Sequence, residues 1–257
     1  MHVLSVVHGG DARAEVFAPV VGDAGHALDE WSFAWGTPPP RPLDSYDALL
    51  VFGGAMHADQ DAHHPWLHEE SMWLQGVLHR RRPVLGVCLG AQLLARATGA
   101  WVGRLPDGPE IGWHEVELTG AGAADPVLRV LPQRFDALQW HHYTYGLPAG
   151  AVELARSRAC TQAFRLGDAC WGVQFHPEVA EAQLAGWITD PDDPPPDSDR
   201  LLAETREQIG RWNELGRALC AAFLDTAERL LAAQASGCVT PNRLQSPGTL
   251  SGSMSTP

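Results

Sequence analysis

A cysteine in the first half of the chain, Cys88, has one glycine two residues before it and another two residues after it, at Gly86 and Gly90. A cysteine nucleophile on a sharp turn between a strand and a helix needs such small neighbours, because they let its side chain stand exposed. The apolar run at 83–87 predicts the strand, and the pattern at 91–98 predicts the helix. The positive end of that helix favours the thiolate form. A packing cysteine held between glycines is the alternative that this segment alone leaves open.

A histidine and a glutamate two residues apart, His176 and Glu178, follow a second apolar run. Pro177 between them fixes the direction of the chain. A cysteine nucleophile needs a base, and the base needs a third group that holds its imidazole in one tautomer. Alone, this segment is more typical of a surface loop. Together with Cys88 it indicates a Cys–His–Glu triad.

The two segments together resemble the class I, triad-type glutamine amidotransferases, whose pattern is G-x-C-x-G-x-Q with a downstream F-H-P-E. The resemblance covers about residues 1–190 and is closest to stand-alone proteins similar to the amidotransferase domain of GMP synthase. That closer similarity is carried by His64-Pro65-Trp66-Leu67, Gln162-Ala163-Phe164-Arg165 and Val173-Gln174-Phe175-His176-Pro177-Glu178. The resemblance implies an α/β fold of flavodoxin-like architecture, with a mostly parallel central sheet flanked by helices.

The resemblance also implies a role for each matching residue. Cys88 would attack the side-chain amide carbon of glutamine, His176 would move the proton, and Glu178 would orient His176. The backbone N–H groups of Gly54 and Leu89 would form the oxyanion hole. The residues implied in substrate binding are Gln92, His141 and His142.

One segment departs from the family pattern. Related proteins often read W-H-G-D where this chain has Trp140-His141-His142-Tyr143, so a histidine replaces the small residue and a tyrosine replaces the acid. In the family this segment contacts the amino-acid end of glutamine. Two substrates therefore stay open: glutamine, with ammonia passed to a synthetase on a separate chain, or another γ-glutamyl amine or peptide. A non-catalytic binding protein that keeps the fold is a third alternative.

The elements that must position these residues follow from the apolar patterns. Strands are expected at 3–7, 27–33, 46–52, 83–87, 112–118, 137–141 and 151–156, with a hairpin over 160–166 and 170–175. Helices are expected at 65–81, 91–98 and 181–189, with a shorter one within 8–26. In such sheets, sites lie at the carboxyl ends of the strands, which is where Gly54 and Cys88 are expected.

Four regions are predicted along the chain. They are an amidotransferase domain at 1–190, an acidic proline-rich linker at 191–199, a C-terminal helical extension at 200–235 and a disordered tail at 236–257. The helical pattern of the extension is compatible with docking on the domain or with a dimer interface. The oligomeric state does not follow from the sequence.

Composition argues against several classes of function. The net charge of −13 disfavours nucleic acid or an anionic membrane as the main partner. All 18 basic residues are arginine, which excludes Schiff-base chemistry and a P-loop lysine. The five scattered cysteines, the lack of a signal peptide and the lack of a long apolar run predict a cytoplasmic protein.

No cofactor and no metal site are predicted. Four histidines and two aspartates cluster at 57–68, but the segment lacks a helix or strand period that would aim them at one point. A solvated loop near the mouth of the site is the preferred interpretation.

Overall fold

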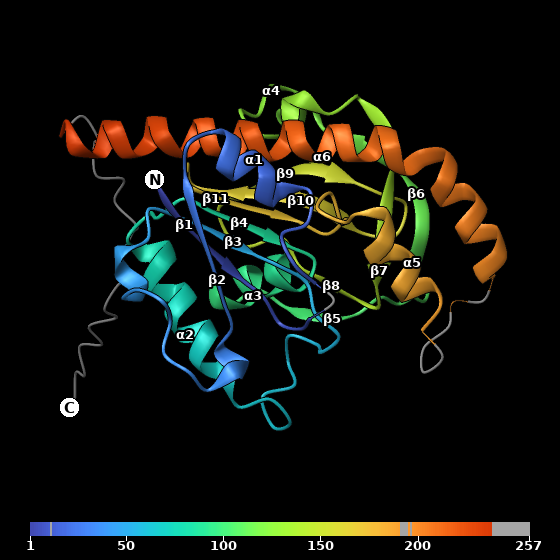
Figure 1. Ribbon diagram of the computed structural model, residues 1–257, viewed down its shortest axis with the longest axis horizontal. Coiled ribbons are helices and arrows are strands. Elements are labelled where there is room, and N and C mark those ends of the chain that lie inside the picture. Colours follow the sequence, from blue (N-terminus) through green and yellow to red (C-terminus); the bar gives the residue numbers. More distant parts are fainter. Residues whose placement is uncertain (11, 191–194, 196, 238–257) are drawn as a thin grey trace, which may run out of the picture.

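The computed structural model describes residues 1–10, 12–190, 195 and 197–237 of the 257-residue chain (Figure 1). Most of the predicted linker and nearly all of the predicted disordered tail lie outside the described residues. The division into domain, linker and extension therefore stays a prediction.

Strands and helices alternate in the first half of the described chain, and the second half consists of strands, with one short helix among them, followed by two further helices. The elements are β1 (His2–Val6), α1 (Phe17–Asp23), β2 (Ala27–Trp31), β3 (Ala48–Val51), α2 (Trp66–His79), β4 (Val84–Val87), α3 (Leu89–Ala97), β5 (Val102–Arg104), β6 (Glu110–Leu118), α4 (Gly120–Ala124), β7 (Arg134–His141), β8 (Tyr143–Tyr145), β9 (Ala151–Arg156), β10 (Thr161–Leu166), β11 (Cys170–Val173), α5 (Glu181–Ile188) and α6 (Ser198–Ala235). Residues 101–160 are expected to form several short strands and turns, but none of the ranges named above covers β5, α4 or β8, because elements this short leave no periodic pattern in a sequence.

The central sheet has nine strands within the described part of the chain, in the order β2-β1-β3-β4-β11-β10-β9-β6-β7. The pairs from β2 to β11 are parallel, and the pairs from β11 to β7 are antiparallel. Only β10 and β6 therefore run against the other seven strands. The predicted fold class, an α/β fold with a mostly parallel sheet, is confirmed.

Helices cover both faces of the sheet, so the central strands are buried on both sides (Figure 1). The alternation along β4 shows this, because Leu85 joins one hydrophobic core with α1, α5 and α6, whereas Val84 joins the other with α2 and α3. α6 contacts α1, α5 and β6. The C-terminal helix is therefore docked on the domain.

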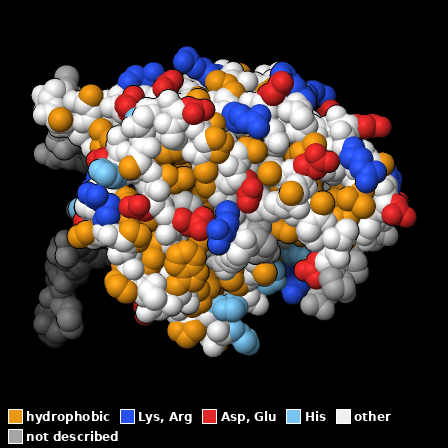
Figure 2. All heavy atoms as spheres, in the orientation of Figure 1, with side chains coloured by type: hydrophobic (Ala, Val, Ile, Leu, Met, Phe, Trp, Pro, Cys, Tyr) orange, Lys and Arg blue, Asp and Glu red, His pale blue; other side chains and the backbone are white. Residues whose placement is uncertain are grey.

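The surface shown in Figure 2 mixes acidic and basic side chains, without a large region of one sign. Across the described residues, no helix combines the length and the apolar character that crossing a membrane would require.

Candidate active site

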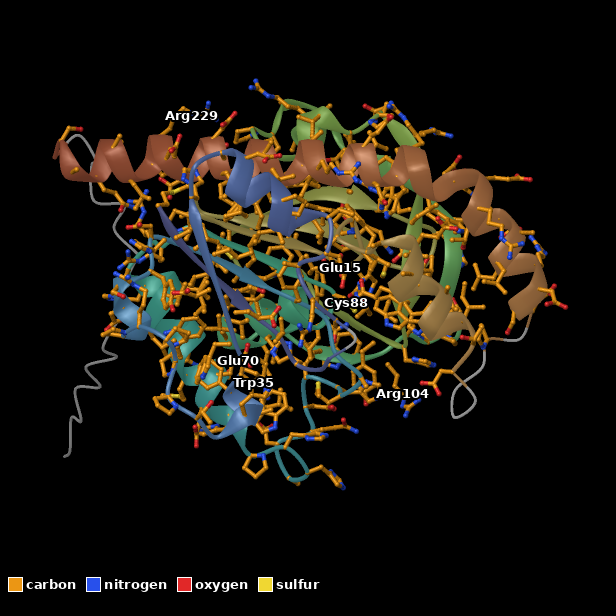
Figure 3. All side chains as sticks on the ribbon, viewed as in Figure 1. Glu15, Trp35, Glu70, Cys88, Arg104 and Arg229 are labelled. Carbon is orange, nitrogen blue, oxygen red and sulfur yellow. The ribbon has the colours of Figure 1, made fainter. Side chains whose placement is uncertain are left out.

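Cys88 forms a sharp turn between β4 and α3, at the carboxyl end of the parallel strands (Figure 3). Its backbone lies at φ +52° and ψ −109°, in a region that non-glycine residues rarely adopt. Its N–H donates to the carbonyl of Val173 at 2.8 Å, and its own carbonyl accepts from the N–H of Gln92 at 3.1 Å. The predicted strand–turn–helix is present, with α3 beginning directly at Leu89.

The two flanking glycines let α3 pack directly on the sheet. A Cβ on Gly86 would lie 2.6 Å from the backbone of Gly90, and a Cβ on Gly90 would lie 2.0 Å from the carbonyl oxygen of Val51. The sequence left open whether these glycines serve a sharp turn at Cys88 or the close packing of a helix on a strand. The same two glycines serve both.

His176 lines the same cavity as Cys88, and Glu178 lies behind His176. The imidazole Nδ1 is 2.8 Å from the Glu178 carboxylate, and both side chains are buried. A Cβ on Gly53 would lie 3.1 Å from the imidazole Cε1 and 3.7 Å from the Cys88 Cβ, so both side chains adjoin the same glycine. Burial opposes the charged imidazole, but the charges of Glu178 and Cys88 outweigh it and raise the pKa of His176 to about 10. This environment favours an imidazolium that is held in one orientation.

A buried ion pair that was not predicted from the sequence lies against the backbone that leads from β3 to Gly53 and Gly54. The Nδ1 of His8 is 3.1 Å from the carbonyl oxygens of both Phe52 and Gly53, and its Nε2 is 2.9 Å from Glu70. With acceptors at both ring nitrogens, His8 carries a proton on each. Burial lowers its pKa, but Glu70 outweighs this and raises it overall. One signal was available: His8 comes just after the first predicted strand, at the sheet edge where sites form.

Two further contacts involve His8. Trp66 stacks on His8, with ring centroids 5.6 Å apart, and lies one turn before Glu70 on α2. A Cβ on Gly54 would lie 2.7 Å from the Cβ of His8, so a glycine lets the backbone pack this closely on His8. The expected oxyanion-hole residue Gly54 is therefore packed against His8, which Glu70 and Trp66 hold in place.

The His8–Glu70 pair predicts that stability falls as the pH rises. Below about pH 6.5, His8 is protonated in both folded and unfolded chains, and the pair contributes fully. At higher pH the unfolded chain loses this proton first, so the free energy of unfolding falls by at most about 1.4 kcal/mol per pH unit until the raised pKa of His8 is passed. Urea unfolding at about pH 6 and about pH 8 measures the fall. Glu70→Gln should show a smaller fall; equal falls in the two proteins would contradict the prediction.

The side chains of Gln92 and His141 both hydrogen-bond to the backbone of the segment that follows β7. The amide nitrogen of Gln92 donates to the carbonyl of Tyr143 at 3.0 Å, and Nδ1 of His141 donates to the same carbonyl at 2.9 Å. His142 and Tyr143 lie at the cavity, where His57 stacks on Tyr143 with ring centroids 3.9 Å apart. His57, from the predicted solvated loop, thus lines the site together with Ala55 and Met56 just before it.

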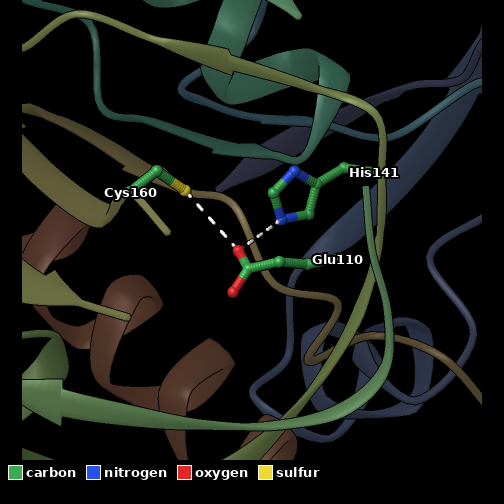
Figure 4. A group of neighbouring side chains, drawn as sticks. All are labelled: Glu110, His141 and Cys160. Atoms are coloured by element: carbon green, nitrogen blue, oxygen red, sulfur yellow. Dashed lines mark hydrogen bonds and ion pairs between the residues drawn. The ribbon is translucent and has the colours of Figure 1, made fainter. Parts of the chain in front are cut away.

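A second group of cysteine, histidine and glutamate side chains lies behind this segment (Figure 4). The Glu110 carboxylate is 3.1 Å from His141 Nε2 and 3.6 Å from Cys160 Sγ, so the glutamate stands between the sulfur and the imidazole. It also accepts from Gln162 at 2.8 Å. Burial and the nearby Glu110 charge raise the pKa of Cys160 to about 12, which opposes a thiolate.

The order of groups in this second cluster does not suit nucleophilic catalysis, in which the base must contact the thiol. The three possible ligand atoms lie within 4.8 Å of one another, a spacing compatible with a metal ion. Because the Glu110 oxygen already accepts from Gln162, we interpret the group as a network in which Glu110, held by Gln162, forms an ion pair with His141.

A cavity of about 200 Å³ opens at Cys88. All the residues predicted for the site line it except Glu178, which is buried behind His176. The lining is completed by backbone and side chains of Ala12, Ala55, Met56, His57, Trp140, Tyr143, Trp187 and Asp190. The structure thus brings the Cys88 thiol, the His176 imidazole and the residues Gly54 and Leu89 to one concave surface, with the Glu178 carboxylate behind the imidazole.

The chain belongs to the class I glutamine amidotransferase family, whose model matches residues 32–185. Among its relatives, the glutamine amidotransferase-like protein YfeJ of Salmonella typhimurium is 31% identical over 193 residues, which are 73% of this chain and 80% of YfeJ. The GMP synthase of Aeropyrum pernix is 38% identical over 125 residues, 48% of this chain but only 23% of that protein.

A third relative is a hydrolase. The gamma-glutamyl-L-1-hydroxyisopropylamide hydrolase of a Pseudomonas species is 32% identical over 155 residues, 57% of this chain and 52% of that protein. Among solved structures, a glutamine amidotransferase from Thermotoga maritima has a TM-score of 0.76 and 28% identity, and the match covers 87% of this chain and 97% of that one.

Proposed function

We propose that this protein hydrolyses a γ-glutamyl amide bond through a thioester on Cys88. The observation that carries the proposal is the cavity in which Cys88 and His176 lie together, with Glu178 hydrogen-bonded behind the imidazole at 2.8 Å. Class I family membership supports the same chemistry.

The proposed reaction has two steps. The Cys88 sulfur attacks the amide carbon, and the N–H groups of Gly54 and Leu89 stabilise the oxyanion, each by about 3 kcal/mol in comparable enzymes. Leu89 suits this role because it begins α3, where N–H groups have no intrahelical acceptor. His176 protonates the departing nitrogen as the C–N bond breaks. It then takes a proton from water, which displaces the sulfur and releases the γ-carboxylate of glutamate.

The first candidate substrate is glutamine. Ammonia would then be the leaving group and would pass to an acceptor enzyme on a separate chain. The similarity to a glutamine-hydrolysing GMP synthase and to YfeJ supports this assignment.

The second candidate is another γ-glutamyl amine or peptide. One observation favours it: His142 and Tyr143 stand at the cavity, with His57 stacked on Tyr143, where the family pattern has a small residue and an acid. The similarity to the Pseudomonas γ-glutamyl hydrolase supports the same assignment.

A panel of γ-glutamyl compounds tests both candidates. Wild-type protein is assayed for glutamate release from glutamine, γ-glutamyl alkylamides and γ-glutamyl dipeptides, with Cys88→Ala as the control. A glutamine-mimicking electrophile should label Cys88 stoichiometrically, as read by mass spectrometry. Dominant turnover of glutamine selects the first candidate, and dominant turnover of an amine or peptide selects the second. No turnover and no labelling would overturn the proposed function.

A further inference from the structure

The long C-terminal helix α6 reaches the segment that carries His176 and Glu178. It begins at Ser198, beyond the region matched by the family model, and runs along one face of the sheet (Figure 1). Its buried residues extend from Leu201 to Ala227, so it is integrated into the core over most of its length.

Three residues within about one helical turn of α6 contact the backbone of this segment. The indole N–H of Trp212 donates to the carbonyl of His176 at 2.7 Å. The side-chain amide of Asn213 donates to the carbonyl of Val179 at 2.8 Å. A Cβ on Gly216 would lie 1.9 Å from the carbonyl oxygen of Pro177, so a glycine there is what permits such close approach.

These bonds meet a need of the segment itself. Residues 176–179 are buried, form neither helix nor strand, and must find partners for their backbone groups outside regular structure. The N–H of His176 donates to Leu138, and the carbonyl of Glu178 accepts from Val16. The carbonyls of His176 and Val179 rely on α6. A buried carbonyl left without a donor costs about 1–3 kcal/mol. Loss of a donor on α6 would therefore shift the backbone of residues 176–179.

We propose that α6 is a positioning element of the active site, in which Trp212 and Asn213 hold the backbone so that His176 stays hydrogen-bonded to Glu178 and directed at Cys88. The proposal rests on the proposed function of the triad. It gives a role in the active site to the C-terminal extension, whose residues lie outside the region that the family model matches.

Trp212→Phe tests the proposal, because it removes the N–H donor and keeps a ring against Phe135 and Phe175. Trp113→Phe is a matched control: the indole of Trp113 donates to Thr205 on α6 at 3.2 Å and not to the catalytic segment, and phenylalanine keeps a ring edge-on to Trp212, 6.0 Å away between centroids in wild type. We expect Trp212→Phe to lower kcat by about 10- to 100-fold with KM within about 3-fold. Trp113→Phe should retain the kcat of wild type, at a comparable thermal midpoint.

A second readout does not depend on turnover. The proton between His176 Nδ1 and Glu178 should give a low-field proton NMR signal in wild type and in Trp113→Phe. It should shift or broaden in Trp212→Phe and in Asn213→Leu, which removes the other donor. An unmoved signal and an unchanged kcat in both variants would overturn the positioning role. If wild type hydrolyses no γ-glutamyl compound, the proposed function fails, and the NMR signal still decides whether α6 positions the pair.

Discussion

Glu178→Gln is expected to lower kcat on the best γ-glutamyl substrate by about 10³- to 10⁴-fold, the size of effect seen when the orienting acid of a comparable triad becomes an amide. The carboxylate of Glu178 accepts from Nδ1 of His176 at 2.8 Å inside a buried site. An amide can present its NH₂ group to the ring, which selects the wrong tautomer. It also removes the negative charge that stabilises the imidazolium.

The pH dependence should change in a defined direction. Glu178 is one of the groups that raise the pKa of His176, so its neutral replacement lowers that pKa. An imidazolium–thiolate pair would then lose its proton at lower pH. The alkaline limb of the kcat/KM profile should therefore shift to lower pH. Glu181→Gln, on the exposed first turn of α5, is the control and should leave the profile unchanged. A Glu178→Gln enzyme with wild-type kcat would remove Glu178 from the mechanism.

Gly90→Ala is expected to destabilise the fold by more than about 3 kcal/mol, at the upper end of what overpacking costs. The new methyl group would lie 2.0 Å from the carbonyl oxygen of Val51. Because a β3 carbonyl cannot move away cheaply, α3 would have to shift, and it carries Leu89 and Gln92. Urea unfolding measures the loss of stability, and residual folded enzyme should also lose activity.

Gly210→Ala is the control, and we expect it to raise the free energy of unfolding where Gly90→Ala lowers it. Gly210 is also inside a helix, α6, but a Cβ there meets nothing within 4 Å. With no clash, alanine should stabilise the protein by about 0.5–1 kcal/mol, since glycine is the poorer helix former. Equal effects of the two substitutions would show that helix propensity, rather than close packing on β3, decides at Gly90.

The sequence predicted those parts of the site in which the relevant residues lie close together along the chain. Cys88 with its two glycines and His176 with Glu178 each form a local pattern, and strand or helix periodicity places both segments at the same edge of the sheet. Such patterns can be recognised in a sequence without any knowledge of tertiary contacts.

The parts that the sequence did not predict depend on pairs of residues distant along the chain. His8 meets Glu70 across 62 residues, and Trp212 meets His176 across 36. Neither member of such a pair is unusual in its own segment, because a histidine after a strand or a tryptophan on a helix is compatible with many roles. Only the packing of α2 and α6 on opposite faces of the sheet brings these partners together.

The docking of α6 also bears on when a newly made chain could become active. Ribosomes deliver the chain from its N-terminus, and segments fold as they emerge. A nascent chain that ends between Glu178 and Trp212 would already contain Cys88, His176 and Glu178, but not the helix that donates to the His176 carbonyl. Under the proposed function and the proposed role of α6, synthesis order would delay hydrolysis until α6 has packed on the sheet.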